Sequence, residues 1–490
     1  MYTILNNIIT AFGPNGGSVF FLAGSYSFSN FLNITGISNF KIVSSTGAKL
    51  TTGLNKIFLF SGTFSNLEIA GLRFESIRSN TTDDPDGMIT FANFGTSDIE
   101  NNIYIHDCYF TNPNTKANAI KMVSEGAASM ISNIRILYNQ FISIGRMGIE
   151  IQNHNYSPVK VRIQNFKIDN NYLYDVGTIQ TGVSVSCISV SGTITDGQIN
   201  YNSIRDMRMN TTTNTYYGIE NAGAIRLNTI GNLISSSTYG FTGILASGTD
   251  SSQVSAGIPI KRSWIVANNI IELAGSITDK TKIREIDINN IVGYSIHDNI
   301  IVTDGVAMRL TNASYGIIHQ NRCKVLAGNV LYLQGGSTYN KINFNLLDNS
   351  GAGSQDGMIS FNDSNTVGNR AIGNSWVPQA SGNFYFTNNS GAVNNTNSIS
   401  GYFKAITIND YNISEGDDIL FVNISSGGQI HFPNPIAYIG NAGREISIYN
   451  ENTLNALTLL DNLKPSTPSS IPANGSAKAR SNGSAWIIRL

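Results

Sequence analysis

The sequence contains few charged residues, few prolines and few cysteines for its length. Only 13% of its 490 residues are Asp, Glu, Lys or Arg, and the formal net charge is −1. A near-neutral chain without runs of Lys or Arg is unlike a nucleic-acid-binding protein. The three cysteines, Cys108, Cys187 and Cys323, are odd in number and far apart, so they provide neither a disulfide framework nor a zinc site. We therefore expect no nucleic-acid partner, no metal and no other cofactor.

Long apolar runs are also missing. No stretch of about 18 or more consecutive apolar residues occurs, so we expect no membrane insertion. The sequence instead has 47 glycines, many asparagines and frequent Val, Ile, Thr, Tyr and Phe, which is typical of β-strands joined by tight turns. The start of the chain is an exception, because its apolar residues share one helical face and predict a short capping helix. These residues are Ile4, Leu5, Ile8, Ile9 and Phe12.

An Ile-x-x-Asn-x-apolar pattern, with small variations, recurs nine times in the middle of the chain. Its asparagines are Asn139, Asn171, Asn202, Asn228, Asn269, Asn299, Asn321, Asn345 and Asn374. The pattern describes a strand, a one-residue corner and a second strand, and its uneven spacing places insertions in the outer turns. Stacked Asn side chains can pass hydrogen bonds from one copy to the next, because an amide both donates and accepts. The repeat therefore predicts an all-β fold, a right-handed single-stranded parallel β-helix with an Asn ladder.

A second strand with the pattern apolar-x-apolar recurs between the Asn corners. Because side chains alternate along a strand, its middle residue should point outward. In two coils the pattern is less regular, and there we assign Tyr216 and Leu245 to the outward row. The predicted row is Thr90, Lys121, Glu150, Ser189, Tyr216, Leu245, Asp287, Arg309, Tyr332 and Ser360.

Four regions are expected along the chain. Residues 1–65 should form the capping helix and first strands, and residues 66–390 the coils of the β-helix. The low-complexity run GAVNNTNSISG at 391–401 is predicted to be a linker. Residues 402–490 contain short alternating strands with polar turns, which predict a small antiparallel β domain.

Several motifs carry a resemblance to a known family. They are Gly16-Gly17-Ser18-Val19-Phe20, Gly24-Ser25-Tyr26 and Gly47-Ala48-Lys49-Leu50 near the start, and GREISIYNENTLNALTLL and NGSAWIIRL near the end. Together they resemble bacteriophage tailspikes, the capsule depolymerases with a pectate-lyase-like β-helix. The resemblance implies a homotrimer on the phage virion that binds and cleaves a bacterial capsular polysaccharide or O-antigen. It also implies that residues 66–390 hold the glycan and that residues 402–490 serve trimerisation or binding.

Glycoside hydrolysis requires two carboxyl groups on either side of the scissile bond. Glu285 and Asp287 are two residues apart on one predicted strand, so they should share a face, and we hypothesise that they are the acid and the base or nucleophile. Arg309 and Tyr332, on the next coils, would hold an anionic sugar. The alternative is that Asp287 and Arg309 form a cross-strand ion pair on an exposed sheet.

Two other carboxylates are candidates for the same role. Glu150 lies next to Lys121 in the predicted row and is followed by His154 and Tyr156, which would contact substrate. The alternative for His154 is an ordinary loop residue without a role in the site. The alternative, which the sequence favours, is that Lys121 and Glu150 form a surface ion pair.

Glu220 is the second of these candidates, and it lies close to Tyr216, whose ring suits stacking against a sugar. Tyrosines are also common on β-strands for other reasons.

The function favoured by these features is endo-acting glycoside hydrolysis of a bacterial surface polysaccharide. Two alternatives stay open. A polysaccharide lyase of the same fold would cleave a uronic-acid polymer by elimination, and an adhesin would bind the glycan without cutting it.

Overall fold

The structure is a computed structural model of the chain, and its description covers the following residues. They are 1–80, 86–153, 161–179, 185–208, 216–237, 241–248, 261–273, 283–326, 329–348, 359–377, 386–388, 396–398, 404–406, 410–413, 419–422, 428–432, 445–450, 455–473, 475–481 and 485–490.

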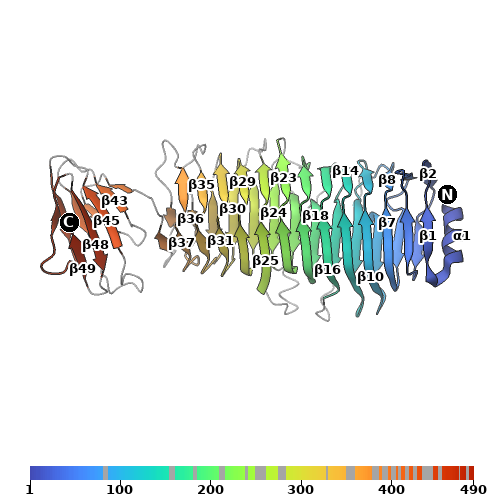
Figure 1. Cartoon of the computed structure of the whole chain (residues 1–490), viewed down its shortest axis with the longest axis horizontal. Coiled ribbons are helices and arrows are strands. Elements are labelled where there is room, and N and C mark those ends of the chain that lie inside the picture. The colour runs from blue at the N-terminus through green and yellow to red at the C-terminus, as the bar shows by residue number, and fades with distance from the viewer. Residues whose placement is uncertain are drawn as a thin grey trace. The chain divides into compact units, whose positions relative to one another are not determined.

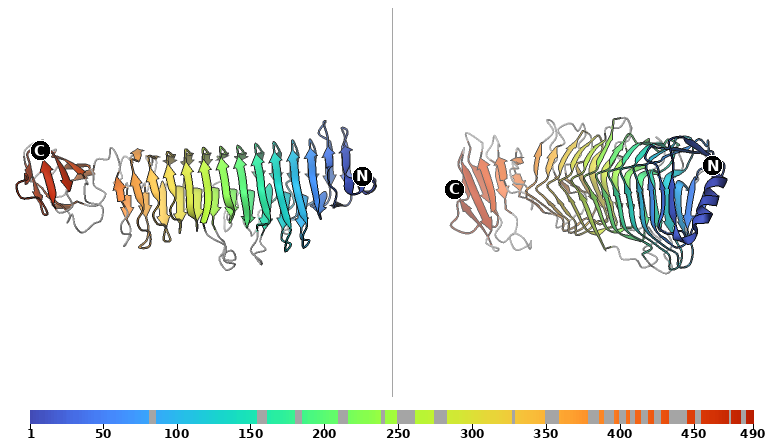
Figure 2. Two further views of the ribbon diagram at one scale, coloured as in Figure 1. Left: turned by 60° about the horizontal axis from the view of Figure 1, so that its bottom comes forward. Right: turned by 45° about the vertical axis from the view of Figure 1, so that its right-hand side comes forward.

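The chain divides into two compact units. The first consists of Met1–Asn340, Leu346–Val367 and Val377–Val393, and the second of Lys341–Asn345, Gly368–Trp376 and Asn394–Leu490. In the described part of the first unit, the chain passes through three sheets in turn, adding one strand to each sheet per coil. Every pairing between strands of neighbouring coils is parallel (Figures 1 and 2). The predicted parallel β-helix is thus confirmed.

We name the sheets A, B and C in the order in which the chain enters them. In the first unit, sheet A contains β1 (Gly17–Phe20), β4 (Phe40–Val43), β7 (Phe64–Ala70), β10 (Ile99–His106), β13 (Met130–Leu137), β16 (Ile163–Asp169), β19 (Ile194–Asn200), β22 (Ile225–Ile230), β25 (Lys261–Ala267), β28 (Val292–His297) and β31 (Ile317–His319). Sheet B contains β2 (Ser25–Phe28), β5 (Lys49–Thr52), β8 (Arg73–Ser76), β11 (Tyr109–Asn112), β14 (Gln140–Ile144), β17 (Tyr172–Val176), β20 (Ser203–Arg205), β23 (Leu233–Ser236), β26 (Ile270–Leu273), β29 (Ile300–Thr303), β32 (Arg322–Val325) and β35 (Leu346–Asp348). Sheet C contains β3 (Leu32–Thr35), β6 (Phe58–Ser61), β9 (Gly87–Asn93), β12 (Asn118–Ser124), β15 (Ile149–Asn153), β18 (Val185–Gly192), β21 (Tyr216–Ala222), β24 (Thr242–Ser247), β27 (Arg284–Asn289), β30 (Val306–Thr311), β33 (Leu331–Gln334), β36 (Ile359–Phe361) and β39 (Phe386–Asn388).

The interior of the coils is filled by the apolar residues of the repeat. Phe74, Phe110 and Phe141 are fully buried and stack on consecutive coils, with ring centroids 4.9 and 5.0 Å apart. At the N-terminal end, helix α1 (Tyr2–Phe12) buries Leu5 and Ile9, and the short helix η1 (Gly13–Asn15) follows it. The helix lies beside β1 at the N-terminal end (Figure 1), and Phe12 packs edge-on against Phe40, as expected for a capping element.

The Asn ladder runs along the corner between sheets A and B. At each step the backbone N–H of one Asn donates to the side-chain oxygen of the next, at 2.9–3.1 Å. The side-chain amides donate to the same oxygens, and to backbone carbonyls of neighbouring coils. In the first unit the members are Asn139, Asn171, Asn202, Asn232, Asn269, Asn299 and Asn321.

One predicted ladder position is wrong. The ladder passes through Asn232, whereas Asn228 lies on the outer side of β22 and pairs in register with Gln198 and Ile265. In this coil the buried position three residues before the corner is Thr229 instead of Ile. A search for Ile at that position therefore selects the wrong Asn, four residues too early.

Three of the second unit's parallel strands, β34, β37 and β40, pair with each other, and Asn345 bonds to Asn374. Its strands, wholly or in part, are β34 (Lys341–Asn343), β37 (Arg370–Ile372), β38 (Ser375–Val377), β40 (Thr396–Ser398), β41 (Lys404–Ile406), β42 (Asp410–Asn412), β43 (Ile419–Val422), β44 (Gln429–His431), β45 (Glu445–Asn450), β46 (Leu457–Leu460), β47 (Ser470–Ile471), β48 (Ser476–Ser481) and β49 (Trp486–Arg489).

The expected antiparallel pairing near the C-terminus is confirmed for β45 with β48, β48 with β49 and β46 with β47. The strands before them, β41 to β46, pair in parallel, which the sequence did not reveal. This region has its own apolar core around Trp486, Ile430 and Ile448. Among the described residues, no helix is long and apolar enough to cross a membrane.

Candidate functional site

The outward row of sheet C brings most of the candidate residues into one line. Register pairs Lys121 with Glu150, Glu150 with Ser189, and Ser189 with Glu220. The row then continues through Leu245, Asp287, Arg309, Tyr332 and Ser360. It is the predicted row with one correction, because Glu220 stands where Tyr216 was expected.

Tyr216 lies elsewhere. It begins β21, pairs in register with Val185 and is buried, so its ring is not available for stacking against a sugar. His154 and Tyr156 lie outside the described residues.

Glu150 is the centre of a buried polar cluster. Only 5% of it is exposed, and its Oε2 lies 2.7 Å from Nζ of Lys121 and 3.2 Å from a guanidinium nitrogen of Arg146. The amide of Asn118 donates to the same oxygen at 2.7 Å. Burial alone would raise the pKa of Glu150, but the two cations and the hydrogen bonds outweigh it and lower that pKa below its usual value. Glu150 is therefore ionised at neutral pH.

Glu220 has the opposite environment. The hydroxyls of Ser186 and Ser189 donate to its Oε2 at 2.7 and 2.8 Å, and no cation pairs with it among the contacts that the structure describes. Burial raises the pKa of Glu220, the two serines oppose that rise, and the negative charge of Glu150 adds to it. The net effect is a raised pKa, which favours the protonated carboxylic acid.

The two carboxyl groups flank Ser189, one on each side. Neighbouring strands of a parallel sheet are about 4.8 Å apart, so the backbones of Glu150 and Glu220 are roughly 9.6 Å apart. Ser189 stands between the two residues, and its hydroxyl is bonded to Glu220. A pair of carboxyl groups whose environments drive their pKa values apart is the arrangement that separates an acid from a base in an active site.

Asp287 is engaged in a buried ion pair. Arg309 donates to both of its oxygens, at 2.9 and 2.6 Å, and Arg284 approaches within 3.3 Å. Asp287 is 2% exposed. Asp287 and Arg309 thus form the cross-strand ion pair that the sequence offered as the alternative. The pair is buried, whereas an exposed pair was expected.

Glu285 does not share a face with Asp287, contrary to the sequence prediction. It is 0% exposed, and the glycine at the same register position in the preceding coil, Gly243, faces the side chain of Ile271 in the core. Glu285 and Ile286 are consecutive and both turn inward, so the strict alternation assumed from the sequence fails at this end of β27. Burial raises the pKa of Glu285 well above its usual range.

Three members of this site were not found in the sequence. They are Arg146, Asn118 and Ser186. Arg146 precedes Glu150 by four residues, Asn118 lies one coil before Glu150, and Ser186 precedes Ser189 on the same strand. Their contacts come from the way the coils stack, and only the short Arg-Met-Gly-Ile-Glu segment carried a local signal, a cation close to a carboxylate.

Comparisons with known proteins show a likeness of fold. No protein-family model matches the sequence, and neither does any curated protein. Among solved structures, the chain is similar to the A-module of the mannuronan C-5 epimerase AlgE4 of Azotobacter vinelandii, at 13% identity and a TM-score of 0.46 over 82% of this chain and 95% of that one. It is also similar to tailspike protein 3 of bacteriophage CBA120, at 11% identity and a TM-score of 0.47 over 84% and 60% of the two chains. A third similar structure is the tailspike of the E. coli bacteriophage HK620 in complex with a hexasaccharide, at 11% identity and a TM-score of 0.46 over 99% and 87%. The similar structures thus include phage tailspikes and another β-helix enzyme, at low sequence identity.

Proposed function

We propose that the protein is an endo-acting glycoside hydrolase that cleaves a bacterial surface polysaccharide, a capsule or an O-antigen. The observation that carries the proposal is the pair Glu150 and Glu220, whose pKa values move in opposite directions on one line of sheet C. The sequence resemblance to phage tailspikes supports the choice of substrate.

In this mechanism Glu220 is the general acid. Both serine hydroxyls donate to Oε2, so the proton of the neutral acid belongs on Oε1, which is then free to donate it to the glycosidic oxygen. The C–O bond breaks as that oxygen takes the proton, and positive charge develops on the sugar ring.

Glu150 is the general base. Lys121 and Arg146 keep it ionised, and it accepts a proton from the water that attacks the anomeric carbon on the opposite side of the ring. Glu150 and Glu220 lie two strands apart with Ser189 between them. The proposal gives the attack to water, with Glu150 as its base, so the expected product has inverted anomeric configuration.

Arg309 and Tyr332 are proposed to contact more distant sugars of the same chain, because they follow the acid and the base on the same row. We also propose that the protein is a homotrimer carried on the phage virion, on the strength of the sequence resemblance.

The test is incubation of the purified protein with a panel of capsular and O-antigen polysaccharides, followed by size-exclusion chromatography and mass spectrometry. Oligosaccharides that carry one added water per cleavage, with an inverted anomer by proton NMR, are expected. Products that lack this water and contain an unsaturated uronate would instead establish the lyase. A glycan that binds but is not shortened after long incubation would establish the adhesin.

A further inference from the structure

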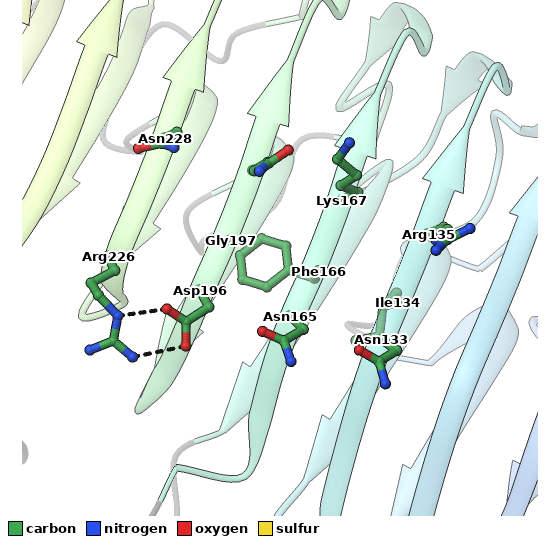
Figure 3. Close-up of a pocket in the computed structure, with 11 residues that line it drawn as sticks. Asn133, Ile134, Arg135, Asn165, Phe166, Lys167, Asp196, Gly197, Arg226 and Asn228 are labelled. Carbon is green, nitrogen blue, oxygen red and sulfur yellow. Dashed lines mark hydrogen bonds and ion pairs between the residues drawn. The ribbon is translucent and has the colours of Figure 1, made fainter.

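A second polar surface lies on sheet A, away from the row that carries Glu150 and Glu220. Here a hollow of about 420 Å³ spans the neighbouring strands β13, β16, β19 and β22 (Figure 3). Three steps between four strands amount to roughly 14 Å, which is longer than a single small anion.

Two cations stand side by side in this hollow. Arg135 and Lys167 are register partners on β13 and β16, and the row continues with the amides of Gln198 and Asn228. Among the described residues Arg135 has no ion-pair partner. Lys167 is 49% exposed and lies 3.9 Å from Asp169, at the limit of an ion pair. Like charges directly opposite each other destabilise a sheet, so folding does not account for this pair.

A row of amides borders the cations. Asn66 bonds to Asn39, and Asn102 to Asn66, each at 2.7 Å, and all three have a left-handed backbone. Asn133 and Asn165 continue the row with the same backbone conformation and line the hollow. Between these two, no direct hydrogen bond joins the described side chains, so the amide of Asn165 is open to a ligand.

The far edge of the hollow is closed by an ion pair. Arg226 donates to both oxygens of Asp196, at 2.6 and 2.8 Å, which holds the carboxylate in place and neutralises it. The hollow is therefore net positive in a chain whose own net charge is −1, and it contains no carboxyl group free to act as an acid or base.

We propose that this hollow is an accessory binding site for a segment of an acidic polysaccharide. Arg135 and Lys167 would pair with the carboxylates of uronic-acid units, and the amides of Asn165, Gln198 and Asn228 would exchange hydrogen bonds with hydroxyl groups. The site binds without cutting, so it does not depend on the hydrolase proposed for sheet C.

The experiment measures binding of hexagalacturonate by calorimetry to the Glu220→Gln protein, with neutral maltohexaose as the matched ligand. The Glu220→Gln substitution is used so that cleavage of a ligand cannot contribute to the measured heat. The binding result can then be interpreted whether or not the protein is a hydrolase. The test variant adds Arg135→Ala and Lys167→Ala. The control variant adds Arg322→Ala and Lys324→Ala, which removes the same charge from two exposed positions of β32 on sheet B.

The expected result is binding of hexagalacturonate but not maltohexaose, weakened about tenfold or more by the test pair and by less than about twofold by the control pair. Raising the salt concentration should weaken it further. Absence of hexagalacturonate binding, equal binding of maltohexaose, or equal losses in the test and control variants would each overturn the proposal.

Discussion

The outer faces of sheets C and A are built from the same coils with the same strand spacing, yet they hold polar side chains in opposite ways. On sheet C, Lys121 and Glu150 are almost completely buried and bound to each other. On sheet A, Arg135 and Lys167 point outward and are exposed. Burial shifts the pKa values of polar side chains, and removing one member of a buried pair destabilises the fold. Exposed charges contribute little to the stability of the fold, and they attract ligands of opposite charge.

The largest effect is expected on catalysis. Glu220→Gln should lower kcat by about 10²- to 10⁴-fold, because the amide cannot supply a proton. Circular dichroism and melting temperature should stay close to wild type, since Gln still accepts from Ser186 and Ser189. Glu272→Gln, at an exposed position of β26, is the matched control and should keep full activity. Undiminished activity of Glu220→Gln would remove the proposed acid.

The next comparison sets a buried arginine–carboxylate pair against an exposed one. Arg309→Ala leaves Asp287 buried with only the longer contact to Arg284, and should lower the free energy of unfolding by about 3 kcal/mol. Arg226→Ala breaks an equally well-formed pair with Asp196, but both partners are exposed, so about 0–1 kcal/mol is expected. Urea unfolding of both variants measures the difference, and equal losses would contradict the contrast.

Two asparagines allow a similar comparison of a buried with an outward-facing side chain, with a smaller expected difference in stability. Asn269→Ala removes the oxygen that accepts from the backbone and side chain of Asn232, and should cost about 1–3 kcal/mol. Asn228→Ala, on the outer side of sheet A, should change stability by less than about 0.5 kcal/mol. If Asn228→Ala were the more destabilising of the two in urea unfolding, the ladder assignment would be wrong.

The pH dependence should also differ between the two faces. The proposed hydrolysis requires Glu150 ionised and Glu220 protonated, so kcat/KM should fall as pH drops through the lowered pKa of Glu150 and again as pH rises through the raised pKa of Glu220. Hexagalacturonate binding on sheet A should not follow these two changes in rate, because neither Glu150 nor Glu220 lines the hollow. A rate that keeps rising through the alkaline range would point to a deprotonated base and hence to elimination.

The sequence allowed the β-helix, the ladder corner and most of the sheet C row to be predicted, because each depends on a local pattern that repeats. Asn232 was missed because Thr229 replaced the expected Ile, and Glu285 was misplaced because alternation fails at the start of β27. The amide row of sheet A also has a local signature in the sequence, because the pattern Asn-apolar-x-Ile occurs at Asn39, Asn66, Asn102, Asn133 and Asn165.

The candidate site was harder to predict than the fold. Glu150 and Glu220 were both candidates, but nothing in the sequence distinguishes the proposed acid from the proposed base. That distinction depends on Arg146 and Asn118 near one carboxylate and on two serines near the other, and these contacts exist only once the coils are stacked in register.

The ladder corner has a consequence for how such a protein can change over time. Successive members are separated by as few as 22 residues, between Asn299 and Asn321, and by as many as 37, between Asn232 and Asn269, with nearly the same hydrogen-bond length of 3.1 and 2.9 Å. The cost of closing a longer loop rises only slowly with its length. Insertions in the outer turns therefore have little effect on the packing of the core. Each turn can change in length and sequence during evolution while the coils keep their structure.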